Sequence, residues 1–355
     1  MARVRPRIVH LHARTSAVSE RLIDIAHTAG AAVVFTYHTP TVTCGRGTMM
    51  LFGETPCDGK VEVRRCTACA LEGLKAPRPL AWLAAALPGP LKRLAPRGAS
   101  KPWTVLGVPA LMADAQAASL RFLDKVDHVV AVAQWVHDVL RRNDVPAEKI
   151  TLSRQGVDLR MPPPAPAGRA VGGPLRLAYF GRIDRAKGPD LLAEAMALAP
   201  GADVRLDIYG IDQSGGAGAA QACLARAAAA DPRVRLLPSV APSEVTRTMA
   251  GYDLIAVPSR WLESGPLVVL EAFAAGAPVL GARLGGIAEL VRDGIDGELV
   301  PPDDAPAWAA AIERHAADRS RAEALRQGVA PPRTMDAPAN DMAALYDRIL
   351  VPASR

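Results

Sequence analysis

Short apolar runs alternate with amphipathic stretches along most of the 355-residue chain. The runs predict strands at residues 7–11, 32–37, 127–132, 149–153, 175–180, 204–209, 234–237, 254–257 and 279–282. The amphipathic stretches predict helices between them, among them 16–29, 111–125 and 134–143. Regular alternation of strands and helices predicts an α/β protein with parallel sheets and right-handed crossovers.

A proline-rich segment at residues 160–174 divides this pattern and is expected to be an interdomain linker. Residues 1–159 predict a first domain, which is incomplete and carries a cysteine-rich insertion over 40–79. Residues 175–335 predict a second domain, and residues 336–355 a terminal helix that returns to the first. The chain is long enough for two such domains.

Composition bears on the location of the protein. Half of the residues are hydrophobic but only 4% are aromatic, so the core is expected to consist mostly of Ala, Val and Leu. The chain has no apolar run of about 18 residues, as a membrane-spanning helix would need. The basic start from Met1 to Pro6 lacks the apolar stretch of a signal peptide. We therefore expect a cytoplasmic protein, either free or peripheral at the cytosolic face of a membrane.

Charge is unevenly distributed along the chain. Residues 1–170 hold 23 Lys and Arg against 13 Asp and Glu, whereas residues 171–355 hold 19 against 23. A basic first half suggests an anionic partner, such as a phosphate-bearing acceptor or an anionic membrane surface, although an ordinary solvated face gives the same count. Nucleic-acid binding is not expected, because a basic face for that purpose also needs aromatic side chains.

Segments that follow strands are where a site is expected, because ligands of parallel α/β sheets bind beyond the carboxyl ends of the strands. The first such segment is Gly181-Arg182-Ile183-Asp184-Arg185-Ala186-Lys187-Gly188. Its glycines allow a tight turn, and Arg182 and Lys187 lie beside the next helix N-terminus, where a diphosphate would be stabilised. The same segment also fits a solvated basic turn.

Two carboxylates follow a later strand. Glu263 precedes a helix that is expected to begin near Pro266, with Ser264 or Gly265 as N-cap. Glu271 lies inside that helix among apolar residues, where a buried carboxylate without a partner costs several kcal/mol. Ribose and hexose hydroxyls would be suitable partners. The alternative is a structural salt bridge to Arg182, Arg260 or Arg283.

A paired glycine, Gly285-Gly286, lies at the next strand–helix junction. It either opens backbone N–H groups to an anion or makes a plain tight turn.

Together these segments resemble the family-4 glycosyltransferases of the GT-B fold, also called glycosyl transferases group 1. The resemblance covers the second domain and rests on the E-x7-E spacing of Glu263 and Glu271, the Gly-Arg…Lys-Gly loop, and the runs 271–279, 285–289 and 293–297. It implies a GT-B fold, in which two Rossmann-like domains with parallel sheets face each other across a cleft.

The resemblance also implies residue roles. Arg182 and Lys187 would hold the donor diphosphate, Glu263 the donor sugar hydroxyls and Glu271 the ribose. The backbone from Ser264 to Leu267, which includes Gly265, would help to position the sugar, with Gly285 and Gly286 nearby.

The family mechanism implies retention of anomeric configuration and no obligatory divalent metal, because the basic pair neutralises the leaving diphosphate. The chain agrees, since it contains no Asp-x-Asp triplet. It also has no carboxylate pair placed as nucleophile and acid, which favours front-face displacement. No cofactor is expected to be required for catalysis.

The first domain resembles the family in part. Residues 35–39 end a strand where the family carries a donor-contacting histidine, so His38 is the candidate for that role, although a single histidine is more often structural. Residues 155–158 resemble the turn that closes this domain, with Gln155 in place of the usual Asn, and Pro238 replaces a usual glycine. The opening strand and glycine-rich loop of the family have no counterpart, and about two βα units, on the order of 60 residues, are expected to be missing.

Four cysteines cluster in the insertion with the spacing C-x12-C-x8-C-x2-C; they are Cys44, Cys57, Cys66 and Cys69. In a cytosolic protein this cluster favours a structural zinc site over disulfides, with free thiols as the other alternative. Some sugar transferases of polysaccharide assembly carry a similar insertion.

From Lys75 to Lys101 every charged residue is positive, and an apolar run from Leu80 to Leu87 lies among them. This combination fits contact with an anionic membrane surface, and equally a solvated proline-rich loop.

These observations predict a glycosyltransferase that moves a sugar from a UDP- or GDP-linked donor to a glycan or lipid-linked acceptor. Its pathway would be polysaccharide, lipopolysaccharide or glycolipid assembly. The alternative is a non-catalytic GT-B subunit that binds a nucleotide sugar or a partner. A sugar-nucleotide epimerase is opposed by the E-x7-E loop, and a dehydrogenase by the lack of a G-x-G-x-x-G segment after any strand.

Overall fold

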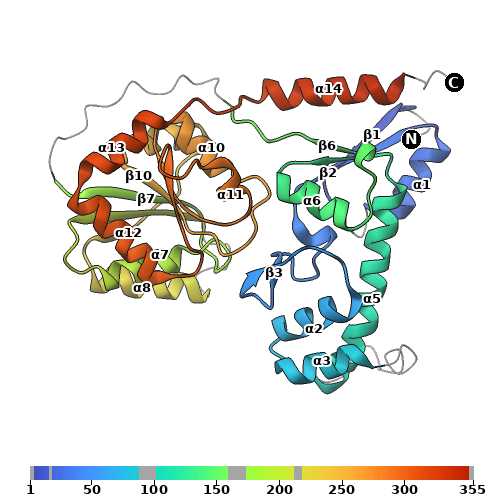
Figure 1. The fold of residues 1–355 in the computed structure, drawn as a ribbon, viewed down its shortest axis with the longest axis horizontal. Helices are drawn as coiled ribbons and strands as arrows, with labels where there is room; N and C mark the ends of the chain where they lie inside the picture. The colour runs from blue at the N-terminus through green and yellow to red at the C-terminus, as the bar shows by residue number, and fades with distance from the viewer. Residues whose placement is uncertain (1–3, 16–17, 88–100, 159–172, 212–217, 352–355) are drawn as a thin grey trace. The chain divides into compact units, whose positions relative to one another are not determined.

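The computed structural model describes residues 4–15, 18–87, 101–158, 173–211 and 218–351. The chain divides into two compact units, which we describe separately: unit 1 comprises residues 1–154 and 341–355, and unit 2 comprises 155–340 (Figure 1). The linker expected at 160–174 lies almost entirely outside the described residues, as do Lys92, Arg93 and Arg97 of the basic segment.

Unit 2 is built on a parallel sheet, which has six strands in the described part of the chain. In spatial order they are β12 (Gly297–Val300), β11 (Val279–Ala282), β10 (Leu254–Val257), β7 (Leu175–Arg182), β8 (Val204–Ile211) and β9 (Val234–Leu237). The order along the sheet reverses between β7 and β10. The loops after these two strands therefore diverge, which leaves a crevice beyond their carboxyl ends.

Helices cover both faces of this sheet, so strands such as β10 and β11 are apolar throughout. All residues of β10 and β11 are buried, as expected of strands in a covered parallel sheet. The helices are α7 (Pro189–Leu198), α8 (Ala219–Ala230), α9 (Val245–Met249), α10 (Leu267–Ala274), α11 (Gly285–Leu290), α12 (Ala305–Ala317) and α13 (Arg319–Gly328). The sequence pattern located five of these strands but missed the short β12.

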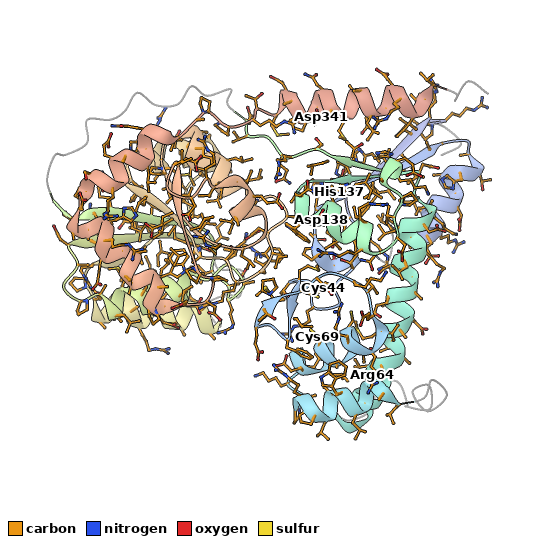
Figure 2. The ribbon with its side chains drawn as sticks, viewed as in Figure 1. Cys44, Arg64, Cys69, His137, Asp138 and Asp341 are labelled. Atoms are coloured by element: carbon orange, nitrogen blue, oxygen red, sulfur yellow. The ribbon has the colours of Figure 1, made fainter. Side chains whose placement is uncertain are left out.

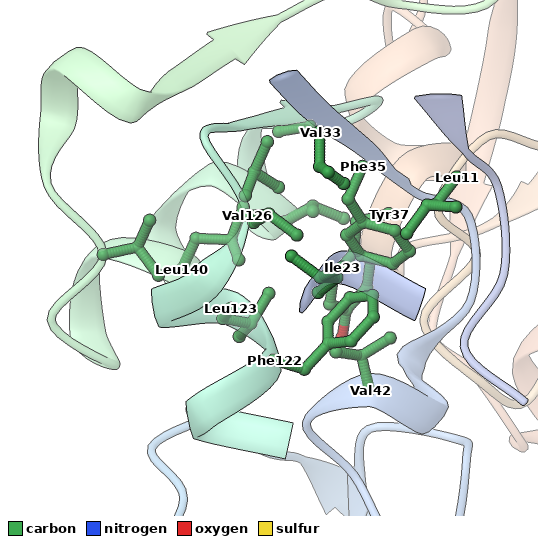
Figure 3. Close-up of a cluster of buried hydrophobic side chains, with 14 of the residues drawn as sticks. Leu11, Ile23, Val33, Phe35, Tyr37, Val42, Phe122, Leu123, Val126 and Leu140 are labelled. Atoms are coloured by element: carbon green, nitrogen blue, oxygen red, sulfur yellow. The ribbon is translucent and has the colours of Figure 1, made fainter. Parts of the chain in front are cut away.

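Unit 1 has a smaller parallel sheet in the order β1 (Ile8–Leu11), β2 (Ala32–Tyr37), β5 (His128–Ala131) and β6 (Ile150–Leu152). Helices α1 (Glu20–Thr28) and α6 (Gln134–Arg142) pack on one face. There Val33, Phe35 and Tyr37 of β2 join the core shown in Figure 3. The alternate residue Val34 faces the other side and packs against Leu345 of α14 (Asp336–Leu350), so the terminal helix covers the second face.

The insertion expected at residues 40–79 continues in the structure to Lys125 and contains more regular structure than its sequence suggests. It includes η1 (Pro40–Val42), a hairpin of β3 (Met50–Leu51) and β4 (Thr55–Pro56), α2 (Val63–Gly73), α3 (Arg78–Ala86) and α5 (Lys101–Lys125). Helix α5 begins at Lys101 rather than at the expected residue 111, and it continues through Pro109. Its residue Val108 joins Ala68, Leu71 and Ala81 in a small core, so packing against α2 and α3 compensates for the poor local propensity.

Among the described helices, none combines the length and the apolar character that crossing a bilayer requires.

Candidate active site

A cavity of about 420 Å³ lies in unit 2 beyond the carboxyl ends of β7 and β10. Its lining includes Arg182 and Lys187 from the segment after β7, Glu263 from the loop after β10, and Leu267 and Glu271 from α10. The structure thus brings together the two cations and the two carboxylates that the sequence singled out. The position is the one expected for a ligand of a doubly wound sheet.

The loop after β7 is held in a fixed shape by its own polar groups. The side chain of Asp184 accepts a hydrogen bond from the Lys187 N–H at 2.9 Å and pairs with Arg182 at 3.1 Å. Gly188 caps α7 at φ 72°, and a Cβ there would lie 2.2 Å from the carbonyl oxygen of Pro258. A side chain at Gly188 would therefore separate this loop from the loop after β10. Asp184 and Pro258 were not recognised from the sequence as site-forming residues.

Glu263 is 5% exposed and is held by three donors on one oxygen. Its Oε1 accepts hydrogen bonds from Lys187 Nζ at 2.7 Å, from Ser259 Oγ at 2.7 Å and from Trp261 Nε1 at 2.8 Å. These bonds compensate for the burial of the carboxylate and fix its direction. Sequence analysis did not identify Ser259 or Trp261, although a buried carboxylate in this segment required donors of this kind.

The side chain of Glu271 differs from that of Glu263 in having no hydrogen-bond or ion-pair partner among the described residues. It is half-buried and lines the cavity. Burial raises the pKa of its carboxyl above the ordinary value. The expected alternatives Arg260 and Arg283 pair elsewhere, with Asp190 and Asp293 respectively, each at 2.6 Å. A carboxylate without a protein partner on a cavity wall is suited to accept hydrogen bonds from ligand hydroxyls.

The start of α10 differs slightly from the expectation. Pro266 is the N-cap and Leu267 is the first helical residue, so neither Ser264 nor Gly265 caps the helix. Gly265, Pro266 and Leu267 line the cavity, whereas Ser264 is buried and is not part of its lining. A Cβ on Gly265 would lie 2.3 Å from the Gln155 side-chain oxygen, so a side chain at this position would require Gln155 to move.

The glycine pair Gly285-Gly286 contacts the backbone of Glu263 rather than the cavity itself. Gly285 and Gly286 do not line the cavity. The Gly286 N–H donates to the Glu263 carbonyl oxygen at 2.7 Å, and a Cβ on Gly286 would lie 2.6 Å from the same oxygen. This N–H is therefore engaged by the protein rather than open to an anion. The pair lets the β11–α11 junction approach the Glu263 loop closely.

His38 follows β2 at the carboxyl edge of the unit 1 sheet, beside two histidines from β1 and its end that the sequence did not single out. Its Nε2 lies 3.0 Å from His12 Nδ1, and the two rings stack. His12 in turn stacks on His10, whose ring nitrogens contact Thr36 Oγ1 at 2.7 Å and Tyr346 Oη at 2.5 Å. Burial, with His12 beside it, lowers the pKa of His38, so this imidazole is neutral near pH 7.

The four insertion cysteines are reduced and line one small cavity in unit 1. In the described part of the chain, no three His, Cys, Asp or Glu side chains are arranged as a ready ligand set for a metal ion.

The sequence profile of the glycosyl transferases group 1 matches residues 167–329, which include the whole cavity of unit 2. Over most of unit 2 the chain thus resembles the group 1 glycosyl transferases. The family resemblance seen in the Glu263–Glu271 segment is thereby confirmed. Unit 2 contributes every residue that lines the cavity.

Curated proteins similar to this chain include two D-inositol 3-phosphate glycosyltransferases. The protein from Mycobacterium marinum is 39% identical over 139 residues, which are 39% of this chain and 29% of the relative. The protein from Nocardia farcinica is 33% identical over 215 residues, 57% of this chain and 47% of the relative. The chain thus spans less than half of the length of these relatives.

Solved structures similar to this chain confirm the GT-B fold. Anabaena Alr3699/HepE in complex with UDP aligns with a TM-score of 0.62 at 19% identity, over 96% of this chain and 78% of that one. Sucrose-phosphate synthase from Thermosynechococcus elongatus aligns with a TM-score of 0.65 at 21% identity, over 98% and 74%.

Proposed function

We propose that this protein is a retaining glycosyltransferase, which moves a sugar from a nucleoside-diphosphate donor to an acceptor hydroxyl without a divalent metal. The observation that carries the proposal is the composition of the unit 2 cavity, in which Arg182, Lys187, Glu263 and Glu271 line one space. Cations suit a diphosphate, and carboxylates suit the hydroxyl pairs of ribose and hexose. A nucleotide sugar contains both kinds of group.

The donor is proposed to be a UDP- or GDP-linked sugar. Alr3699/HepE, which has the same fold, has been solved with UDP, with UDP and glucose, and with UDP-glucose. These complexes make a UDP-linked sugar the first candidate. Glu271 would accept hydrogen bonds from the ribose and Glu263 from the transferred sugar, while Arg182 and Lys187 bind the diphosphate.

In the proposed reaction, the bond between the anomeric carbon and the donor phosphate oxygen breaks, and a bond to the acceptor oxygen forms on the same face. The acceptor proton passes to the departing phosphate. Arg182 and Lys187 stabilise the negative charge that develops on this leaving group. Neither carboxylate is assigned as a nucleophile, and catalysis depends on positioning and charge stabilisation.

His38 is proposed to contact the donor as a neutral imidazole. Its lowered pKa, caused by burial and by His12, supports a hydrogen-bonding role rather than that of a cation. His12, which hydrogen-bonds to His38 Nε2, would fix the orientation of the ring.

The acceptor is proposed to be a glycan or lipid-linked molecule, used at the cytosolic face of a membrane. Supporting this, Leu74, Leu80 and Leu83 are 65%, 55% and 65% exposed on the insertion. Lys75 and Arg78 lie among them in the sequence and are also exposed. Exposed leucines interleaved with cations suit an anionic bilayer surface. Flotation with vesicles of anionic or neutral lipid tests this, and binding that is independent of lipid charge would contradict it.

The decisive experiment for the donor site is a calorimetric screen of UDP-, GDP- and ADP-sugars in the presence of a chelator. One nucleotide is expected to bind, and Arg182→Ala is expected to weaken it at least tenfold. Arg185→Ala is the matched control, because Arg185 is in the same loop, has a 79% exposed side chain and does not line the cavity. Binding that requires a metal, or no binding by a folded protein, would refute the proposal.

Analysis of the reaction products distinguishes a glycosyltransferase from a non-catalytic subunit that only binds a nucleotide sugar. Donor binding with neither transfer nor donor hydrolysis would favour the non-catalytic subunit. An inverted product linkage would contradict retention.

A further inference from the structure

The insertion gathers four of the five cysteines around one small cavity. Cys44 follows η1, Cys57 follows β4, and Cys66 and Cys69 lie on α2. All four line a cavity of about 20 Å³, in the part of unit 1 where Figure 2 labels Cys44 and Cys69. Such a volume holds about one water-sized atom, so the cavity suits a single ion rather than an organic ligand.

None of the four cysteines forms a disulfide in the structure, although all four line the same small cavity. Clustered free thiols of this kind are suited to hold a metal ion.

The hydrogen bonds around two of the sulfur atoms match those of metal thiolates. The Phe52 N–H donates to Cys69 Sγ at 3.2 Å, and the Gly59 N–H donates to Cys57 Sγ at 3.5 Å. Backbone N–H groups aimed at sulfur stabilise its negative charge. The thiol protons make only long contacts, from Cys57 Sγ to the Asp58 carboxylate at 3.7 Å and from Cys69 Sγ to the Met50 carbonyl at 3.9 Å. Deprotonation would remove only the long contacts and keep the N–H donors.

Cations lie where a thiolate cluster would need them. Arg46, Lys60 and Arg65 line the same cavity. Each of these side chains is also paired with a carboxylate, namely Glu72, Asp144 and Asp58 respectively. Four thiolates with one divalent ion carry a net charge of about −2, which the three cations would offset in part. Arg46 also donates to the Cys69 carbonyl oxygen at 3.0 Å, so its guanidinium is held beside the cluster.

The backbone between the cysteines is of a kind that a cross-link would stabilise. Met49 and Phe52 adopt φ values of 55° and 54°, which are unfavourable for residues with side chains. The hairpin between them and Cys57 pairs only two residues on each strand. A hairpin of this length is not stable alone, and a metal can supply the missing stabilisation in a small domain of this kind.

We propose that Cys44, Cys57, Cys66 and Cys69 bind one structural Zn²⁺, which links η1, the β3–β4 hairpin and α2. Four sulfur ligands favour zinc in tetrahedral coordination. Because the described side chains do not form a ready ligand set, binding requires the sulfurs to turn toward one point. Each thiol releases its proton as its sulfur–zinc bond forms.

The test is metal analysis of the full chain, purified under reducing conditions without added metal. We expect about one zinc per chain, released by a thiol-modifying reagent together with four titratable thiols. In Cys66→Ser/Cys69→Ser, zinc content is expected to fall at least fivefold. Cys223→Ser, in α8 of unit 2, is the control and should retain full zinc.

A second measurement, made on the wild-type protein, tests the proposal even if the cysteine variants fail to fold. Wild-type protein stripped with a strong chelator is expected to show faster amide hydrogen exchange over residues 43–75, reversed by one equivalent of zinc. Cobalt in place of zinc should give the absorption of a tetrahedral thiolate complex. Stripped protein that binds no zinc, a chain that holds iron instead, or unchanged zinc in the double variant would each overturn the proposal.

Discussion

Lys187 and Glu263 are 76 residues apart in the chain, and their side chains meet at 2.7 Å. Lys187 comes from the loop after β7 and Glu263 from the loop after β10, so the ion pair ties together the two sides of the crevice. Lys187 Nζ also lies 5.6 Å from the centre of the Trp261 ring. The cation proposed to hold the diphosphate is thus oriented before a donor arrives.

Replacing Lys187 by Met is expected to lower both donor affinity and stability. Glu263 would stay buried, and its Oε1 would keep the hydrogen bonds from Ser259 and Trp261 but lose the one from the Lys187 cation. We therefore expect a loss of about 1–3 kcal/mol in the free energy of unfolding. Denaturant unfolding and donor titration measure the two effects. Lys187→Met/Glu263→Gln should recover much of the stability but none of the donor affinity. A double variant as unstable as the single one would argue against the ion pair as the cause.

Glu271→Gln is expected to weaken donor binding at least tenfold while leaving the protein as stable as the wild type, or slightly more stable. The reason is that Glu271 has no partner among the described residues, so its charge is not compensated in the apo protein. Calorimetric donor titration and thermal unfolding at pH 7.5 test this. Unchanged donor affinity would remove the proposed ribose contact.

The same carboxyl predicts a pH dependence of donor binding. Burial raises the pKa of Glu271, so its charged form, which accepts hydroxyl hydrogen bonds, is lost at a higher pH than for an ordinary glutamate. Donor affinity should therefore fall as pH is lowered through this raised pKa. In Glu271→Gln this part of the pH profile should be flat, and a profile identical to that of the wild type would contradict the assignment.

Gly286→Ala is expected to disturb the Glu263 loop. The new Cβ would meet the Glu263 carbonyl oxygen at 2.6 Å, and overpacking of this kind costs roughly 1–3 kcal/mol. Donor affinity should fall with stability. Gly201→Ala is the control, because a Cβ there meets nothing within 4 Å and no positive φ is involved. Equal effects of the two substitutions would contradict the close approach of the glycine pair.

Unit 1 should lose stability in mild acid. Burial, with His12 and His38 nearby, lowers the pKa of His10 to about 4. An unfolded histidine has a pKa of about 6.5, so the unfolded chain binds more protons between these values. The free energy of unfolding should therefore fall as pH drops from about 6.5 toward 4.

The pH slope can be assigned to His10 with one variant. His128, whose pKa is also lowered to about 4 by burial with Arg348 and Lys149 nearby, contributes in the same direction. His10→Gln should reduce the slope without abolishing it, as followed by denaturant unfolding at several pH values. A slope that does not change would show that His10 is not the titrating group.

Much of the fold could be predicted from the order of residues alone. Buried parallel strands are apolar on both faces, so runs such as 254–257 and 279–282 were recognisable without structural information. The loops that follow such strands carry the ligand groups, which is why Arg182, Lys187, Glu263 and Glu271 could be named in advance. In the insertion, local propensity was weak, and α2 and α5 form as they do because they pack against each other and α3.

The sequence by itself determined which chemical groups follow each strand, because strand periodicity and loop position are local properties. Only the tertiary structure decided which of those groups are already paired. Glu263 is bound by Lys187 from another loop, whereas Glu271, eight residues further along, has no partner among the described residues. Likewise, Gly286 serves the Glu263 backbone rather than an anion. Whether a side chain has a partner depends on which distant segments of the chain come close to it. The order of the strands in the sheet, rather than the spacing of residues in the sequence, determines which segments these are.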